Sequence, residues 1–216
     1  MAATEKDEMI IGVVDYGAGN LGNVVRALSR LGYRHDVLSA PQNLGEAGSS
    51  IVLVPGVGAF PQAMRSMTDR GWVLALKDWA HAGRPLLGIC IGMQLLCDSS
   101  AEDGFTEGLG LLSGEVKRLS GTEKIPHMGW NEVEWRGQGR DQPGESSFYF
   151  VHGYAVETSP DCIGETEVDG VRFASALRRR NVAGFQFHPE RSGPDGVRFL
   201  GGWLLKLNDV YGKKVR

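Results

Sequence analysis

Short apolar runs that end in glycine or other turn residues alternate with amphipathic stretches over the first hundred residues. The runs cover residues 9–16, 33–39, 49–56 and 85–90, and each predicts a strand. Residues 20–32 carry apolar side chains at helical spacing and end at Gly32, and residues 60–82 predict a helix broken near Gly71. Continuous apolar strands are typical of a mostly parallel sheet with helices on both faces.

The pattern changes after about residue 110. Apolar and polar side chains alternate more regularly in four segments that are rich in aromatic and β-branched residues, namely residues 110–119, 127–135, 146–157 and 172–190. This pattern predicts antiparallel strands. Residues 136–147 predict a loop, and residues 196–212 return to helical spacing. We expect one α/β domain over residues 9–212, with a mostly parallel central sheet, helices on both faces and an antiparallel strand extension. Residues 1–8 predict a disordered tail.

Composition narrows the classes of protein. The chain has 216 residues, 42% of them hydrophobic, which is enough for one core. A net charge of -3 argues against nucleic acid as a partner. The three cysteines, Cys90, Cys97 and Cys162, form neither a disulfide framework nor a zinc motif. With no secretory signal and no apolar run long enough for a bilayer, we expect a cytoplasmic protein.

Cys90 lies between two glycines in GICIG (residues 88–92), where a predicted strand runs into a predicted helix. The pattern matches a nucleophile elbow with cysteine in place of serine, because so tight a turn leaves no room for flanking side chains. The sulfur then lies at a helix N-terminus, where the dipole favours a thiolate. The alternative is a buried structural cysteine at a strand end.

His188 and Glu190 flank a proline after the segment GFQF. Proline favours extended geometry at the preceding residue, and residues two apart in an extended segment project to the same side. We therefore expect Glu190 to orient the His188 ring toward a nucleophile on another strand, as in a catalytic triad. The alternative is a surface histidine near a turn. A metal site is less favoured, because no third ligand appears at suggestive spacing.

Val57 lies between two glycines in PGVG (residues 55–58), at the end of a predicted strand. Glycines let a ligand approach the backbone amides, and open parallel sheets bind ligands at these strand ends. An oxyanion hole made of the Val57 and Ile91 amides would lie beside Cys90. The alternative is a strand-to-loop turn, which the segment taken alone favours.

A competing motif is the GxGxxG of residues 17–22, formed by Gly17, Gly19 and Gly22 after a strand and before a helix. This spacing is that of dinucleotide-binding proteins, and Asp36 lies in the stretch where such proteins bind ribose. However, Asp36 falls inside a predicted strand rather than at its end. A dinucleotide site would also leave the cysteine elbow and the His-Pro-Glu segment without purpose.

Six segments together resemble the class I (triad) glutamine amidotransferases, in the family's order from about residue 10 to 205: DYGAGN, PGVGAF, GICIGMQLL, KIPHMGWN, FYFVHGY and GFQFHPERS. GICIGMQ and HPE indicate only the wider superfamily. PHMGWN with DYGAGN and PGVGAF is similar to a narrower family, the glutaminase subunits of imidazole glycerol phosphate synthase. The resemblance implies that glutamine is hydrolysed to glutamate and ammonia through a cysteine thioester, without a cofactor, in histidine biosynthesis.

The resemblance also implies roles for particular positions. Cys90 would be the nucleophile, His188 the base and Glu190 its orienter. Glutamine would be held by Gly58, Gln94, Glu102 and the backbone of Gly153 and Tyr154. The chain departs from the family at Ile91, where leucine is usual, and at Gly153, where serine or threonine is frequent. Ile91 contributes only a backbone amide, so the chemistry should survive, whereas Gly153 leaves the grip on glutamine open.

A partner is expected because a glutaminase fold occupies a whole domain of this size and leaves no room for an active site that consumes ammonia. Ammonia released into neutral water is protonated and loses its nucleophilicity, so a second chain must dock over the site. The resemblance identifies that chain as a (β/α)8-barrel cyclase, which forms a heterodimer and makes imidazole glycerol phosphate and AICAR. We expect the docking face to include Met128, Trp130, Asn131, Tyr149 and Arg191. For Trp130, a place at the edge of the core is an equal alternative.

Other functions stay open at this point. One is a glutaminase subunit for pyridoxal phosphate or anthranilate synthesis, from which PHMGWN separates this chain. Another is a non-catalytic module that binds a partner, against which the intact triad argues. The basic run Arg178–Arg180 predicts a solvated hairpin tip rather than a docking site.

Overall fold

The computed structural model describes residues 9–17, 20–46, 48–122, 124–137 and 147–212. The predicted tail of residues 1–8 and most of the predicted loop of residues 136–147 lie outside these ranges. The domain boundaries at residues 9 and 212 stay predictions.

The main sheet has eight strands in the order β2-β1-β3-β4-β14-β13-β12-β9. Its parallel part consists of β2 (Arg34–Leu38), β1 (Ile10–Val14), β3 (Ile51–Val54), β4 (Leu86–Ile89) and β14 (Val182–Phe185). Its antiparallel part consists of β13 (Val171–Arg179), β12 (Cys162–Val168) and β9 (Glu134–Trp135). The expected mostly parallel sheet with an antiparallel extension is therefore confirmed.

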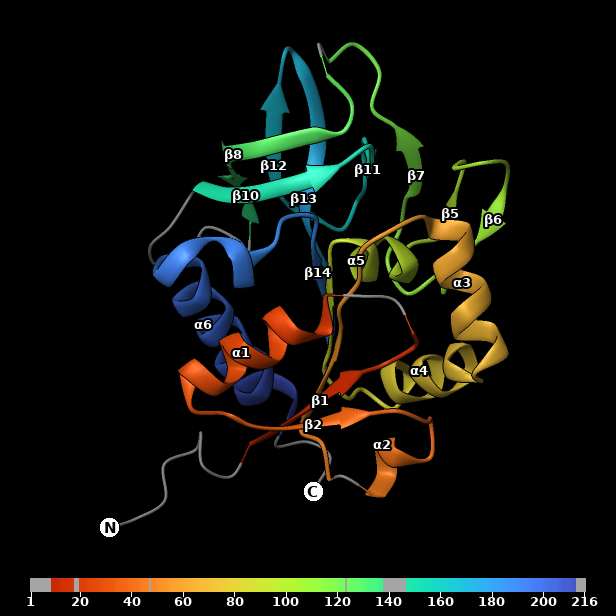
Figure 1. The fold of residues 1–216 in the computed structure, drawn as a ribbon, viewed down its shortest axis with the longest axis vertical. Helices are drawn as coiled ribbons and strands as arrows, with labels where there is room; N and C mark the ends of the chain where they lie inside the picture. The colour runs from red at the N-terminus through yellow and green to blue at the C-terminus, as the bar shows by residue number, and fades with distance from the viewer. Residues whose placement is uncertain (1–8, 18–19, 47, 123, 138–146, 213–216) are drawn as a thin grey trace.

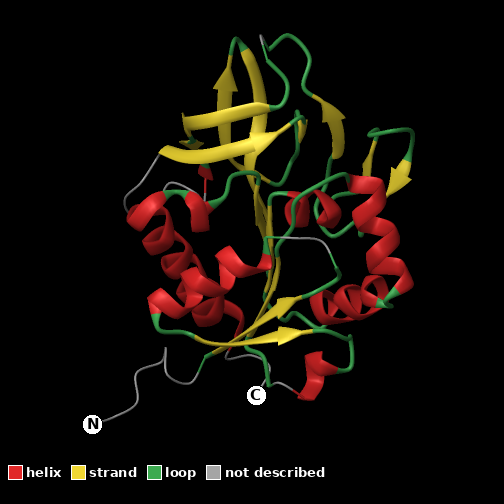
Figure 2. Cartoon of the chain, viewed as in Figure 1, coloured by secondary structure: helices red, strands yellow, loops and turns green. Residues whose placement is uncertain are grey.

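Helices cover both faces of the parallel part (Figures 1 and 2). One face carries α1 (Leu21–Leu31) and α6 (Gly193–Tyr211), and the other carries α3 (Phe60–Asp69), α4 (Trp72–His81) and α5 (Ile91–Leu96). Each face buries its own apolar cluster. The helix ends agree with the sequence, because Gly32 caps α1 and Gly71 separates α3 from α4, both with positive φ.

Two smaller sheets lie beyond the end of the main sheet at which β4 leads into α5 (Figure 1). One pairs β8 (His127–Glu132) antiparallel with β10 (Ser147–His152). The other contains β11 (Tyr154–Val156), β7 (Glu115–Arg118), β5 (Ser99–Ser100) and β6 (Thr106–Glu107). Residues far apart in the chain therefore meet over the carboxyl end of β4.

Several elements differ from the sequence-based expectation, among them the short strands β5 and β6, which were not predicted. β14 pairs antiparallel with β13 but parallel with β4, because its fully buried sequence VAGF fits the interior of the sheet. The strand β12 and the one-turn helix α2 (Asn43–Glu46) were not predicted. The glutamates of β12 weaken its apolar alternation, since part of that strand faces solvent. The run Arg178–Arg180 lies at the β13–β14 hairpin tip, as predicted.

Candidate active site

Cys90 forms the turn between β4 and α5. Its N–H donates to the Phe185 carbonyl at 2.7 Å, and its carbonyl accepts the Gln94 N–H at 3.1 Å, so it closes a strand pair and opens a helix. Its backbone angles are φ 54° and ψ −113°. A positive φ is costly for a residue with a side chain, so this turn is a strained elbow. The elbow holds the sulfur at the carboxyl end of the parallel strands.

The glycines on either side of Cys90 are required by packing. A Cβ at Gly88 would lie 2.6 Å from the Gly92 backbone. A Cβ at Gly92 would lie 1.9 Å from the Val54 carbonyl oxygen. Both distances are far below van der Waals contact, so only glycine lets the strands and α5 approach this closely.

His188 and Glu190 form a fully buried pair beside Cys90. His188 Nδ1 lies 2.8 Å from Glu190 Oε1, and both side chains are 0% exposed. The expected extended geometry was wrong, because Pro189–Arg191 form the 3-10 helix η2. One turn, rather than an extended segment, returns Glu190 to the ring. Ser192 fixes the turn by donating from its hydroxyl to the His188 carbonyl at 2.7 Å.

The surroundings of His188 favour its protonated form. Burial lowers the pKa of His188, but the negative charges of Cys90 and Glu190 outweigh it and raise the pKa from 6.5 to about 10. The ring is therefore protonated at neutral pH. By contrast, burial raises the pKa of the Cys97 thiol, and raises that of Cys162 to about 11, so both remain thiols.

A cavity of about 390 Å³ opens in front of Cys90. Every residue that the sequence assigned to the oxyanion hole or to glutamine binding lines this cavity, namely Val57, Ile91, Gly58, Gln94, Glu102, Gly153 and Tyr154. Arg191, which we expected at the docking face, lines it too, as do Val151 and His152, which were not predicted. A larger cavity of about 470 Å³ lies near the amino end of β14, and its lining residues include no cysteine, serine or threonine.

Gln186 is a site residue that the sequence analysis missed. Its Nε2 lies 3.8 Å from Cys90 Sγ, and its Oε1 accepts from Gln94 Nε2 at 2.9 Å. Gln94 Nε2 also donates to the Tyr154 carbonyl at 2.9 Å. The two glutamines thus join Cys90 to the cavity wall. Gln186 precedes His188 by two residues, which is the spacing that could have revealed it.

Glu102 reaches the cavity from the loop between β5 and β6. Its Oε2 accepts the Phe60 N–H at 2.7 Å, so it caps the first turn of α3. This contact ties the loop to the segment that follows Gly58. Glu102 therefore shapes one side of the cavity as well as lining it.

A pair of buried histidines supports the opposite wall. His152 Nδ1 lies 2.9 Å from the Tyr154 carbonyl, and its Nε2 lies 3.2 Å from His127 Nδ1. Burial and the neighbouring His127 lower the pKa of His152 to about 3, against the raising effect of the Tyr154 carbonyl. His152 is therefore neutral, and its Nδ1–H donates to Tyr154.

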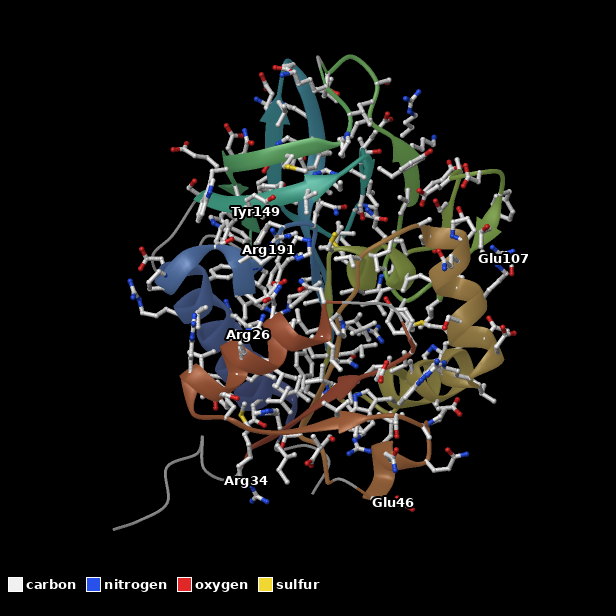
Figure 3. The ribbon with its side chains drawn as sticks, viewed as in Figure 1. Arg26, Arg34, Glu46, Glu107, Tyr149 and Arg191 are labelled. Atoms are coloured by element: carbon white, nitrogen blue, oxygen red, sulfur yellow. The ribbon has the colours of Figure 1, made fainter. Side chains whose placement is uncertain are left out.

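The predicted docking residues on β8 divide between its two faces. Met128 and Trp130 are 63% and 56% exposed on one face. Tyr149 pairs with Trp130 across the strands, and the Arg191 guanidinium carbon lies 4.5 Å from the centre of the Tyr149 ring (Figure 3). Asn131 lies on the other face, where its Oδ1 is 2.8 Å from His127 Nε2.

The dinucleotide alternative gains no support from the structure. Asp36 lies in the middle of β2, paired with Gly12. Within the GxGxxG segment, Asn20 Nδ2 donates to Glu190 Oε1 at 2.8 Å, so this residue faces the His–Glu pair. Among the described residues, no cluster of His, Cys, Asp or Glu could hold a metal ion, and none of their helices is long and apolar enough to cross a membrane.

Comparisons with known proteins identify the family of the chain. The family model of class-I glutamine amidotransferases matches residues 12–206. The chain is 44% identical over 210 residues to the imidazole glycerol phosphate synthase subunit HisH of Desulfitobacterium hafniense, covering 95% of each chain. It is 45% identical over 194 residues to the subunit of the same name from Moorella thermoacetica, covering 88% of this chain and 91% of that one.

Solved structures share the fold at lower identity. A crystal structure of a glutamine amidotransferase superposes with a TM-score of 0.72 at 20% identity, covering 93% of this chain and 99% of that one. The structure of PurLQS from Thermotoga maritima gives a TM-score of 0.69 at 19% identity, covering 92% and 99%. The chain therefore belongs to the class-I glutamine amidotransferases and, within them, to the family of imidazole glycerol phosphate synthase HisH subunits.

Proposed function

We propose that the chain hydrolyses glutamine through a thioester on Cys90 and passes the ammonia to a (β/α)8-barrel cyclase, which makes imidazole glycerol phosphate and AICAR. One observation carries the proposal: Cys90 faces the cavity from a strained elbow, backed by the fully buried His188–Glu190 pair. The names of the relatives support histidine biosynthesis as the setting, and such a pathway would run in the cytoplasm.

Acylation begins with the Cys90 thiolate. It attacks the side-chain carbonyl carbon of glutamine, whose oxygen becomes an oxyanion between the amides of Val57 and Ile91. Protonated His188 gives its proton to the departing nitrogen, and the carbon–nitrogen bond breaks. The products are ammonia, a thioester and a neutral His188 ring.

Deacylation reverses the proton transfer. Neutral His188 takes a proton from a water molecule, whose oxygen attacks the thioester carbon, and the carbon–sulfur bond breaks to regenerate the thiolate. Glutamate leaves, and His188 is again protonated. Glu190 accepts from His188 Nδ1 throughout, which fixes the ring with Nε2 toward the reacting atoms. No step needs a cofactor.

The exposed face of β8 and β10 supports a docked partner. Met128 and Trp130 expose large apolar side chains there, which is frequent at protein interfaces. Val151, on the adjoining strand, lines the cavity, and its carbonyl lies 4.0 Å from Cys90 Sγ. A cyclase seated on this face would receive ammonia close to where it forms.

The test mixes the chain with a barrel cyclase and measures imidazole glycerol phosphate formed from glutamine or from ammonium salts. Cys90→Ala should lower glutamine-dependent synthesis by about 10³-fold or more, since triad members act as a unit, and leave ammonia-dependent synthesis intact. Cys97→Ala and Cys162→Ala should stay within a few-fold of the parent. Retained glutamine hydrolysis in Cys90→Ala would remove the proposal.

A further inference from the structure

Three polar residues form a row at the start of α1, outside the cavity. Asn20, Asn23 and Arg26 are spaced three apart, which sets them on one face of the helix. Asn20 is the N-cap residue, yet its side chain makes no capping hydrogen bond, and its backbone is left-handed at φ 80°. Instead, Asn20 Nδ2 donates to Glu190 Oε1 at 2.8 Å. The side chain is therefore directed at the triad rather than at its own helix.

The row continues outward through two more hydrogen bonds. Asn23 Nδ2 donates to Asn20 Oδ1, and Arg26 Nη2 donates to Asn23 Oδ1. Arg26 is exposed on α1 (Figure 3), whereas Glu190 is 0% exposed. The three bonds thus join a surface guanidinium to the buried carboxylate of the triad.

The two ends of the row fix the direction of every bond in it. A guanidinium can only donate, so Asn23 must turn its Oδ1 toward Arg26. An ionised carboxylate can only accept, so Asn20 must turn its Nδ2 toward Glu190. Each amide then has one orientation that satisfies both neighbours. Reversing either amide would bring two acceptors or two donors together.

Glu190 needs such a partner because only one of its oxygens is held. Oε1 accepts from both His188 Nδ1 and Asn20 Nδ2, at 2.8 Å each. Oε2 is buried without a hydrogen-bond partner among the described residues. When His188 loses its proton to the departing nitrogen, its attraction to the carboxylate falls. Asn20 is then the donor that keeps Oε1 in line with Nδ1.

We propose that Asn20, oriented by Asn23 and Arg26, is a positioning residue that holds the Glu190 carboxylate during turnover. The inference rests on the proposed triad chemistry. Asn20 does not line the cavity, so its loss should act on the chemical steps and not on glutamine binding. Asn20→Ala should lower kcat by about 10-fold and change KM by less than about twofold. An unchanged kcat would overturn the proposal.

Asn23→Asp tests the orientation of the row with almost no change in shape. A carboxylate at position 23 still accepts from Arg26, so α1 should stay intact. It cannot donate to Asn20, whose amide must reverse and then present Oδ1 to Glu190. We expect kcat to fall at least as far as in Asn20→Ala, although position 23 contacts no triad residue. A residue of merely structural importance would tolerate this substitution with kcat unchanged.

Asn43→Asp is the matched control for the added charge. Asn43 lies in α2, where its Oδ1 accepts from the Ala40 N–H and its Nδ2 donates to Glu46 Oε2 at 3.3 Å. A carboxylate keeps the first bond and loses the second, as a carboxylate at position 23 also keeps one bond and loses one. The turnover of Asn43→Asp should equal that of the parent. A similar loss of turnover in both variants would assign the effect to net charge and overturn the proposed orientation.

A double-mutant cycle asks whether Asn20 acts through Glu190. The measured quantity is the rate at which a chloroketone analogue of glutamine alkylates Cys90. Asn20→Ala should slow alkylation several-fold in the parent and have no effect in Glu190→Ala. Independent, multiplicative effects would show that Asn20 acts elsewhere. If Cys90→Ala is inactive but both asparagine variants behave as the parent, the triad stands and only the positioning role falls.

Discussion

The two sides of Cys90 are built differently. On the elbow side, the flanking glycines leave no space for even a methyl group, and the His188–Glu190 pair is fully buried. On the oxyanion side, Val57 is 37% exposed, and a Cβ built on Gly58 would meet no atom within 4 Å. The residues proposed to make and break bonds are therefore immobilised by packing. The segment that would stabilise charge has room to change its conformation.

The change from tight packing to open space occurs between two adjacent residues, Gly56 and Val57. Gly56 is as tightly packed as the elbow, because a Cβ there would lie 2.1 Å from the Tyr16 hydroxyl and 2.2 Å from the Ile91 side chain. Freedom begins only at Val57 and continues to Gly58, which has φ 110°. A partner could thus alter the proposed oxyanion donor, the Val57 amide, while the proposed nucleophile and base stay fixed.

The largest expected effect comes from adding a side chain on the elbow side, where the glycines leave no space. Gly92→Ala forces a methyl group onto the Val54 carbonyl, so the strand and helix must separate, and we expect little folded protein.

Gly58→Ala meets no steric contact but requires a φ that alanine rarely adopts, which should re-aim the adjacent peptide. That variant should fold, with turnover reduced by about 10²-fold. Thermal unfolding and glutaminase assays distinguish the two, and a well-folded Gly92→Ala would contradict the comparison.

A second expected effect concerns the open segment on the oxyanion side, Val57 and Gly58, when the chain is in complex with the cyclase. The isolated chain should hydrolyse glutamine slowly, and a cyclase with its ligand bound should raise turnover by about 10² to 10³, the value of one oxyanion donor. KM should change much less, since Gln94 and Glu102 are held by contacts that do not involve Val57. Turnover is compared for the chain, the complex and the liganded complex. Equal values in all three would mean that the open segment is not a gate.

A smaller effect tests the protonation state of His188 on the elbow side. The pKa of His188, raised to about 10, lies above its ordinary 6.5, so the protonated ring stabilises the fold. That contribution is complete below pH 6.5 and is lost as the pH rises through 10. In Cys90→Ala the raising charge of the sulfur is gone, so the His188 pKa should fall. Imidazole NMR titration measures both values, and equal pKa values would show that the sulfur does not act on the ring.

Local patterns made the elbow side predictable from sequence. The glycine pair around Cys90 and the strand-to-helix switch are consequences of neighbouring residues, so they can be found without knowing the fold. Gly71 separated two helices for the same reason. By contrast, η2 was missed because the preference of a residue before proline describes His188 but not the turn that follows it.

Contacts between distant segments were not predictable in this way. Asn20 meets Glu190 across 170 positions, and Gln186 meets Gln94 across 92. Both contacts exist because β14 enters the sheet beside β4, a pairing that no local periodicity contains. The polar, half-exposed β12 was missed for a related reason. It forms a strand mainly because it pairs with β13 and β9, and its own sequence carries little strand signal.

The left-handed backbone at Cys90 has an evolutionary consequence. Such a conformation costs on the order of 1–3 kcal/mol in a residue other than glycine, and glycine would remove most of that cost. Selection for stability alone would therefore favour glycine at position 90, and selection for the proposed thioester chemistry opposes the change. In a descendant that no longer supplies ammonia, this position should be among the first to drift, leaving a sturdier protein that has lost its activity.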